Sequence, residues 1–449
     1  MQIINAVFSY ISGLGSTIMV PIMFTVVALC FGLGVAKSFK VGLTIGIGFI
    51  GLNLVINLFW TYLTPPADAL LARFGLNLEY FDAGWMVGSA IGFASPVGTF
   101  IIPFALLVNI VLLALNLTKT LNVDIWNFWH YAFYGAMAYN ITGSLVWGYV
   151  MAGVMAAVSL KFGDLGAGYI EEEMGVPGIS VPQCFAASTI PYAFALEALY
   201  DRIPGFNKIN WNADSLAKKI GVFGEPATIG FILGIVMALL AGYDLAGVLS
   251  TALGLAALLF LMPRMVKVLM EGLIPLSEGA KAFMQKHFAG RDFYIGLDSA
   301  ITLANPTTII VSVLIIPITI FIALLPFNVV LPAGDLSAGA YYACFFSLIH
   351  KGNLLRTTIS TSLLMVAIYA LMSHFAPTIN TMALAAGYAS ESAMGISSGV
   401  NVVAGPLLLI VEKLGAVGPI VMVVVGVAIF AALHVIIKKR DAAAAAVEE

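Results

Sequence analysis

Eleven apolar runs divide this chain, and each is bounded by charged residues or by clusters of Pro, Gly and Asn. A helix needs about 20 apolar residues to cross the roughly 30 Å hydrocarbon layer of a bilayer. Apolar residues make up 61% of the 449 and charged residues only 10%, so the chain cannot cover itself with a polar surface in water. The sequence therefore predicts an all-α polytopic membrane protein with about 11 transmembrane helices. The runs lie at about 16–36, 41–63, 97–117, 126–140, 144–160, 224–243, 246–267, 306–329, 336–350, 354–375 and 416–437.

Basic residues predict the orientation of these helices, because short loops rich in Lys and Arg stay in the cytoplasm. Lys37 and Lys40 follow the first run, and the last run ends at 438–440 with two lysines and an arginine. With an odd number of spans, the N-terminus is expected outside and the C-terminus in the cytoplasm. Arg73 is the one clear exception, since it falls in a segment expected outside. The loops at 139–143, 242–247 and 326–334, also expected outside, contain neither lysine nor arginine.

Comparing the chain with itself at an offset of 210 or 211 residues indicates an internal repeat. Asp82 then aligns with Asp292, and Asp124 aligns with Asp335. Two helices, an amphipathic segment, a Pro-interrupted apolar stretch and three helices occur twice, and one helix is left over at the end. Five spans per half would invert the second copy, so the pattern predicts two inverted repeats, which is a transporter architecture. Chance similarity between apolar segments is the alternative.

Four segments are apolar but too rich in Gly, Pro and Ser to face lipid. Irregular backbone at membrane depth is tolerated only where protein or water covers it. We therefore expect re-entrant hairpins at 171–203 and 378–412, and similar segments at 79–97 and 292–306 that each lead through a proline into a span. A binding site is expected among these segments.

His130 lies in the most aromatic window of the chain, VDIWNFWHYAFYGAMAY at 123–139. Aromatic rings against the C–H face of a sugar, with a polar group at the rim, suit a polyol. An interfacial aromatic belt with an anchoring histidine is the alternative.

Two carboxylates fall in apolar surroundings, where an ionisable group usually faces a partner or a cavity. Asp298 lies six residues past the nearest charge and is expected to accept hydrogen bonds from adjacent hydroxyl groups of a substrate. Glu225, in FGEP, is a second candidate, and a helix cap is its alternative role.

The centres of the two hairpins carry neutral polar groups suited to an uncharged polyol. Gln183 and Cys184 lie in the first, and Glu391 with Ser390 and Ser392 lies in the second. Local caps of broken helices are the alternative.

Several function classes are excluded. The net charge is −3, so no basic field for nucleic acid exists. Neither a Walker A sequence nor HEXXH occurs, and the three cysteines have no metal-binding or disulfide spacing, so no metal or cofactor is expected. The N-terminus lacks the basic region and cleavage site of a signal peptide and is expected to be retained.

The sequence resembles the galactitol-type membrane component, enzyme IIC, of the bacterial phosphoenolpyruvate-dependent sugar phosphotransferase system. The resemblance runs in order over nearly the whole chain. The segments that carry it are GLTIGIGFIGLNLV at 42–55, DAGW at 82–85, NVDIWNFWH at 122–130, FGEPATIGF at 223–231, AGYD at 241–244, LMPRMVK at 261–267, IGLD at 295–298 and HKGNLLRT at 350–357.

This resemblance implies a permease of the bacterial inner membrane that binds galactitol or a similar polyol. A separate cytoplasmic IIB subunit, supplied by a IIA subunit, would phosphorylate the sugar, and trapping of the product would drive uptake. A pentitol, ketose or ascorbate-like substrate is the alternative within the family, and an ion-coupled secondary transporter or a passive channel lies outside it.

The related ascorbate-type components imply a homodimer in which a V-motif scaffold holds a moving, substrate-binding core. Residues 1–63 and 224–270 would form the scaffold, 64–223 and 271–412 the core, and 413–449 the final helix and cytoplasmic tail.

The same resemblance implies the substrate-binding positions. His130 and Asp298 are also candidates to assist deprotonation of the attacking hydroxyl. This chain departs from the family where Gln183 replaces a frequent histidine and Tyr134 replaces the glutamine of the ascorbate type. The implied positions are Gly84, Trp85, His130, Tyr134, Gln183, Cys184 and Asp298, with Glu225 added from the sequence pattern.

Overall fold

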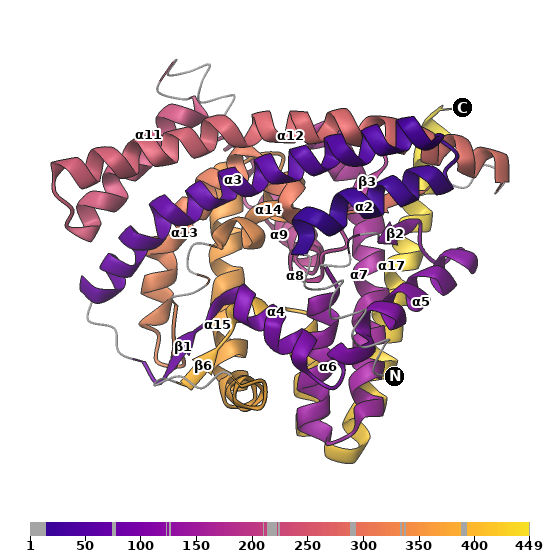
Figure 1. Ribbon diagram of the computed structural model, residues 1–449. Coiled ribbons are helices and arrows are strands. Elements are labelled where there is room, and N and C mark those ends of the chain that lie inside the picture. Colours follow the sequence, from indigo (N-terminus) through magenta and orange to yellow (C-terminus); the bar gives the residue numbers. More distant parts are fainter. Residues whose placement is uncertain are drawn as a thin grey trace.

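A computed structural model describes most of the chain, and it is mostly helical (Figure 1). The described residues are 15–73, 78–122, 124, 127–209, 211–212, 222, 225–287, 293–332, 335, 338–387 and 393–448.

A helix lies at each of the eleven expected runs. The helices before residue 210 are α2 (Gly15–Cys30), α3 (Val35–Arg73), α4 (Gly84–Ala94), η1 (Gly98–Phe100), α5 (Ile101–Ala114), α6 (Phe128–Thr142), α7 (Leu145–Met174), α8 (Cys184–Ala187), α9 (Ile190–Arg202) and η3 (Phe206–Lys208). The later helices are α11 (Pro226–Ala241), α12 (Leu245–His287), η5 (Ser299–Ala304), α13 (Pro306–Ala323), α14 (Gly339–Ile349), α15 (Leu354–Ala385), η6 (Ser397–Gly399), α16 (Ala404–Lys413), η7 (Gly415–Val417) and α17 (Gly418–Glu448).

The length and hydropathy of these helices identify a polytopic membrane protein. In the described part of the chain, four helices are long and apolar enough to cross a membrane, at 145–174, 306–323, 354–385 and 415–442. The pair 84–94 and 98–114 forms a further candidate that is bent by 84° next to Pro96. Other apolar helices, such as 227–241 and 339–349, are shorter. The total of 11 spans therefore stays a prediction.

Helices α2, α3, α11 and α12 pack together as one layer, in which α3 lies along α12 at the top of Figure 1. Small residues allow this approach: a Cβ added at Gly272 of α12 would lie 2.9 Å from the backbone nitrogen of Ile45 in α3. The expected scaffold segments contribute these four helices. Their expected ends at 63 and 270 fall inside α3 and α12, which continue to Arg73 and His287.

Arg73, the exception among the basic residues, has a local role at the end of α3. Its Nη1 donates to the carbonyl of Leu240 at 2.7 Å, near the C-terminus of α11. A cation at this end of a helix interacts favourably with the last carbonyl groups. This contact also places the end of α3 next to the 242–247 loop, which is expected on the same side of the membrane.

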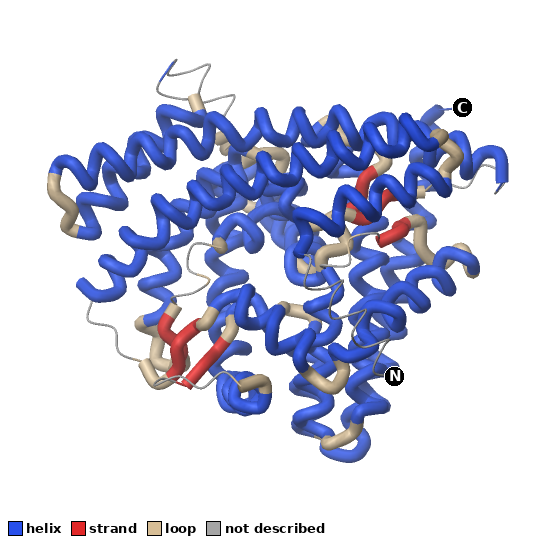
Figure 2. Tube along the Cα trace, in the orientation of Figure 1, coloured by secondary structure: helices blue, strands red, loops and turns tan. Residues whose placement is uncertain are grey.

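Among the described residues, six strands of two or three residues form two parallel sheets, drawn in red in Figure 2. The all-α prediction is therefore wrong for these strands. Strands of two or three residues are too short to show the period-two alternation of apolar and polar residues that predicts a strand. The strands are β1 (Tyr80–Asp82), β2 (Thr120–Asn122), β3 (Ile179–Ser180), β4 (Tyr294–Gly296), β5 (Val330–Leu331) and β6 (Ala393–Gly395).

The two sheets exchange strands between the halves of the chain. In one sheet β1 lies between β5 and β6, with Tyr80 opposite Val330 and Ala393. In the other, β4 lies between β2 and β3, with Ile295 opposite Leu121 and Ile179. Each central strand thus pairs with two strands of the opposite half. This reciprocal pairing is the arrangement that an internal repeat would produce.

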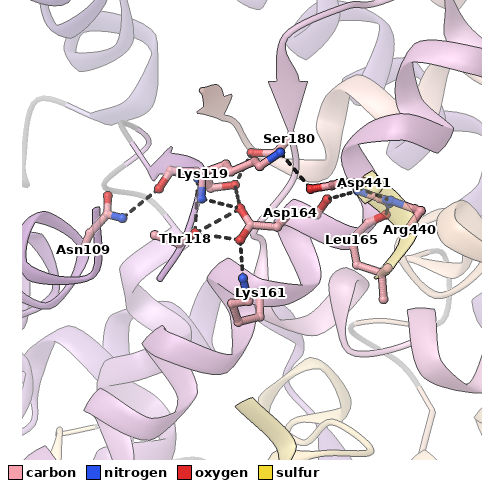
Figure 3. A network of polar contacts seen from close by, with 10 residues as sticks. Asn109, Thr118, Lys119, Lys161, Asp164, Leu165, Ser180, Arg440 and Asp441 are labelled. Atoms are coloured by element: carbon pink, nitrogen blue, oxygen red, sulfur yellow. Dashed lines mark hydrogen bonds and ion pairs between the residues drawn. The ribbon is translucent and has the colours of Figure 1, made fainter. Parts of the chain in front are cut away.

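The end of α17 is anchored by a polar network around Asp164 of α7 (Figure 3). The fully buried carboxylate accepts from Lys161 Nζ at 2.9 Å, from Thr120 Oγ1 at 2.9 Å and from the Lys119 backbone nitrogen at 3.0 Å. Arg440 Nη1 donates to the Leu165 carbonyl at 2.7 Å. Lys119 Nζ pairs with Asp441 at 2.8 Å. The network therefore joins α17 to the end of α7 and to β2.

Candidate functional site

Helix α6 forms one wall of the candidate site, and all its residues from 128 to 138 are buried. His130 is 2% exposed and stacks on Trp129 with ring centroids 3.8 Å apart. The ring of Tyr134, one turn later and fully buried, lies 6.2 Å from the His130 ring. Residues 128–138 of the aromatic window are therefore internal to the protein, so the alternative of an interfacial aromatic belt does not describe His130.

Gln183, in the first expected hairpin, points its amide at His130. Its Oε1 accepts from the Ala186 backbone nitrogen at 2.6 Å and so caps α8. Its Nε2 donates to His130 Nε2 at 3.4 Å. This bond requires a neutral imidazole whose Nε2 carries no proton. Gln183 therefore caps α8 and also contacts His130, a second candidate residue of the site.

Asn401 lies in the second expected hairpin, and its side chain makes the same two kinds of contact as that of Gln183. Its Oδ1 accepts from the backbone nitrogens of Val403 at 2.9 Å and Ala404 at 2.6 Å, at the start of α16. Its Nδ2 donates to the hydroxyl of Tyr134 at 2.9 Å. Each hairpin therefore presents an amide that caps a short helix and contacts α6.

The two segments expected to form hairpins also meet each other directly. Asn401 Nδ2 lies 3.3 Å from the carbonyl oxygen and 3.7 Å from the sulfur of Cys184. Four of the expected site residues, His130, Tyr134, Gln183 and Cys184, therefore join in one buried cluster. Asn401 completes the cluster, and sequence reasoning missed it. Its signal was an asparagine three residues before a helix inside an apolar hairpin, which is a cap pattern.

Asp298 lies at the end of β4 and begins η5. Its carboxylate accepts from the Ala300 backbone nitrogen at 2.8 Å and from the Ser299 hydroxyl at 3.3 Å. The side chain keeps partial exposure in an otherwise buried segment. Asn127 Nδ2, next to α6, donates to the Leu297 carbonyl at 3.4 Å and so connects this segment to the helix of His130.

Gly84 and Trp85 begin α4, directly after β1. Gly84 has a φ of +80°, which favours glycine, and the Trp85 backbone nitrogen donates to Asp335 at 2.9 Å. A Cβ added at Gly92 would lie 3.0 Å from the Trp129 carbonyl oxygen, so α4 packs tightly on α6. The DAGW corner therefore lies beside the helix that carries His130.

Glu225 lies apart from this cluster. Its carbonyl begins α11, its exposed side chain makes no capping hydrogen bond, and α11 packs against α3, α12 and α13. Its expected contact with substrate stays a prediction. Glu391, Ser390 and Ser392 lie outside the described residues.

Chemically, the cluster offers neutral donors and acceptors beside aromatic rings. An imidazole, a phenol and two amides can hydrogen-bond hydroxyl groups, and the partly exposed Asp298 adds a carboxylate. In the described part of the chain, neither a lysine nor an arginine is hydrogen-bonded to these side chains. Such a site suits an uncharged, hydroxyl-rich molecule better than an anion.

Comparison with known proteins gives consistent results. Residues 10–404 match the EIIC-GAT family, described as the PTS system sugar-specific permease component. The chain is 41% identical over 437 residues to a putative permease IIC component of Escherichia coli (strain K12), covering 97% of this chain and 99% of that protein. It is 40% identical over 391 residues to the PTS system galactitol-specific EIIC component of the same strain, covering 85% of this chain and 86% of that protein.

Proposed function

The chain belongs to the family of sugar-specific permease components of the phosphotransferase system, and from this premise we propose that it binds and translocates galactitol or a closely similar polyol. A cytoplasmic IIB subunit, recharged by IIA, phosphorylates the sugar as it arrives. Membership of the family supports these partners, and the name of the galactitol-specific relative supports the substrate. A pentitol, a ketose or an ascorbate-like molecule is the alternative.

The observation that carries the proposal is the convergence of two amide groups, one from each half, on α6. Gln183 contacts His130, and Asn401 contacts Tyr134. Since Tyr134 accepts the Asn401 bond, its own hydroxyl hydrogen remains a donor for a sugar oxygen. Adjacent hydroxyl groups of a polyol would bind these groups and the carboxylate of Asp298.

The burial of the cluster supports a mechanism in which the substrate-binding core moves. His130 is 2%, Tyr134 0% and Asn401 1% exposed, so a polyol reaches them only after surrounding segments move. We propose that the core, 64–223 and 271–412, moves against a scaffold formed by 1–63 and 224–270 in a homodimer of inverted repeats. The reciprocal strand pairing supports the repeat, and the basic residues of the loops support an outer N-terminus and a cytoplasmic C-terminus.

Trapping by phosphorylation makes an ion gradient unnecessary. The phosphorylated product carries about 1.5 to 2 negative charges at neutral pH and no longer fits a site built for a neutral molecule. His130 or Asp298 would assist by accepting the proton of the attacking hydroxyl. For His130 that role requires Gln183 Nε2 to move away first, because the bond from Gln183 occupies the one unprotonated ring nitrogen.

A substitution of Asp298 tests the site. Asp298→Asn removes the charge that strengthens hydrogen bonds from substrate hydroxyls, worth about 1 to 2 kcal/mol, so galactitol affinity should fall roughly tenfold. Isothermal titration of the purified protein measures this. Asp68→Asn, an exposed position on α3, is the matched control and should leave affinity unchanged. Equal affinity in both variants would remove Asp298 from the proposed site.

A further inference from the structure

Two buried aspartates outside the cluster described above face one another across the two halves of the chain. Asp82 ends β1 and is 0% exposed, and Asp335, between β5 and α14, is 1% exposed. Both accept hydrogen bonds from the same residue: Asp82 from the Ser397 backbone nitrogen at 3.1 Å, and Asp335 from the Ser397 hydroxyl at 3.1 Å. Ser397 therefore bridges the two carboxylates.

Three of the four carboxylate oxygens accept hydrogen bonds. Asp82 Oδ1 accepts from the Gly84 and Ser397 backbone nitrogens, both at 3.1 Å. Asp335 Oδ1 accepts from the Trp85 nitrogen at 2.9 Å, and its Oδ2 accepts from the Ser398 nitrogen at 3.1 Å as well as from Ser397 Oγ. Asp82 Oδ2 is buried and has no hydrogen-bond partner among the residues that the structure describes.

Cations do not neutralise this pair. Within the described ranges, no lysine, arginine or histidine forms an ion pair with either aspartate. The ionisable groups that face them are phenols: Tyr342 and Tyr341 from α14, and Tyr369 from α15. Two adjacent anions buried without a cation repel each other and lose their hydration, so one of them should be neutral.

We propose that Asp82 and Asp335 share a single proton, carried on Asp82 Oδ2, and that this proton holds the Gly84–Trp85 corner to the second half of the repeat. The proton comes from water and returns to it, and no other group is consumed. A protonated Oδ2 becomes a donor, which fits the one oxygen that accepts nothing. Asp335 remains the anion, because both its oxygens already accept hydrogen bonds and neither has a free acceptor to which a proton could be donated.

A metal ion fits this geometry less well than a proton. A hard cation needs several oxygen lone pairs directed at one point. Here the lone pairs of three oxygens already face N–H or O–H groups, whose positive ends would repel a cation.

The shared proton would stabilise the contact between the two halves of the chain. The shared contacts tie β1 and the start of α4, in the first half, to η6 and Asp335 in the second. Loss of the proton would place two anions side by side and push these segments apart. Because the folded protein would hold one proton more than the unfolded chain, stability should fall as pH rises above about 4, the ordinary pKa of a carboxyl group, and should level off once the pair has lost its proton.

Infrared difference spectroscopy of the purified full-length protein tests the proposal without substrate or IIB, so its result is independent of the proposed function. At neutral pH the wild type should show a carboxylic-acid C=O band that is missing in Asp82→Asn. This variant should fold, and its thermal midpoint should decrease less than that of the wild type as pH rises, because an amide N–H replaces the O–H donor and does not titrate. Asp335→Asn should be strongly destabilised, because both oxygens of Asp335 accept hydrogen bonds and the amide nitrogen of asparagine would replace one of them, facing an N–H or O–H donor.

Three results would overturn the proposal. The first is a wild-type spectrum at neutral pH without the band that Asp82→Asn removes. The second is an Asp82→Asn protein that unfolds as readily as Asp335→Asn. The third is a thermal midpoint at neutral pH that rises when sodium chloride replaces choline chloride at equal ionic strength, which would identify a cation site.

Discussion

At the scale of single residues, Asn401 has two separable roles, and two substitutions distinguish them. Asn401→Ser keeps a side-chain oxygen that can cap α16 but loses the amide that reaches Tyr134, whereas Asn401→Ala loses both. A serine cap is worth about 1 kcal/mol over alanine, so the serine variant should melt at a higher temperature.

Both Asn401 variants should weaken galactitol binding by a similar factor, roughly five- to twentyfold, because both free the Tyr134 hydroxyl from its buried donor. Titration calorimetry and thermal melts on the same preparations separate the two effects. Wild-type affinity in Asn401→Ser would contradict a role for the amide in the site.

The residues of the site were partly predictable from sequence. His130, Gln183 and Asp298 stood out because a polar or ionisable group in an apolar run needs a partner or a cavity. Asn401 was missed because an asparagine in a Gly-rich stretch is typical of a turn or cap, and its partner Tyr134 is 267 positions away. Asp82 and Asp335 appeared in the repeat comparison, but sequence spacing could not show that they lie together.

At the scale of secondary-structure elements, the crossing of α6 and α7 depends on two glycines. A Cβ added at Gly148 would lie 3.0 Å from the Gly135 carbonyl oxygen and 2.8 Å from Val97 Cγ2. Since backbone cannot move aside as a flexible side chain can, Gly148→Ala should push the helices apart and cost about 1 to 3 kcal/mol.

The matched control for this substitution is Gly168→Ala on the same helix, where an added Cβ would lie 3.9 Å from Arg440 Nη1. Alanine there should be neutral or stabilising by up to about 1 kcal/mol, because it favours the helix. Thermal melts in detergent compare the two variants. Equal thermal midpoints in the two variants would contradict the prediction, because they would show that α6 and α7 can move apart at Gly148 without loss of stability.

A second prediction at this scale concerns the buried ion pair that anchors α17. Asp164→Asn would leave Lys161, whose side chain is 3% exposed, without its carboxylate. Breaking such a pair costs about 3 to 5 kcal/mol, so the variant should melt well below the wild type. Asp441→Asn removes a partly exposed carboxylate that pairs with Lys119 and Arg440 and should cost about 1 kcal/mol or less. A loss as large in Asp441→Asn would mean that the outer pair, rather than Asp164, holds the helix.

Helix positions were well predicted, but helix ends and strands were not. The run expected at 144–160 continues as α7 to Met174, because Lys161 and Asp164 neutralise each other inside the protein. Similarly, α15 runs past 375 to Ala385. The strands escape prediction because two or three residues cannot display alternation, and each strand exists only through partners from a distant segment.

At the scale of the whole molecule, the exchange of strands makes the two halves depend on each other. Because β1 and β4 each pair only with strands of the opposite half in the described part of the chain, neither half alone completes a sheet. Fragments 1–221 and 222–449 should each fail to accumulate when expressed separately. Co-expression should restore galactitol binding, as measured on the copurified pair. A single fragment that is stable and binds galactitol would contradict this interdependence.

The central claim is that this permease moves a neutral polyol whose phosphorylation makes uptake irreversible, and proteoliposomes containing the purified chain test it most directly. Radiolabelled galactitol is supplied outside, and phosphorylated IIB is enclosed inside. The account predicts that label accumulates as the phosphate ester and only when phosphorylated IIB is present, with or without an ion gradient. Accumulation of unmodified galactitol above its external concentration, driven by an ion gradient without IIB, would contradict it.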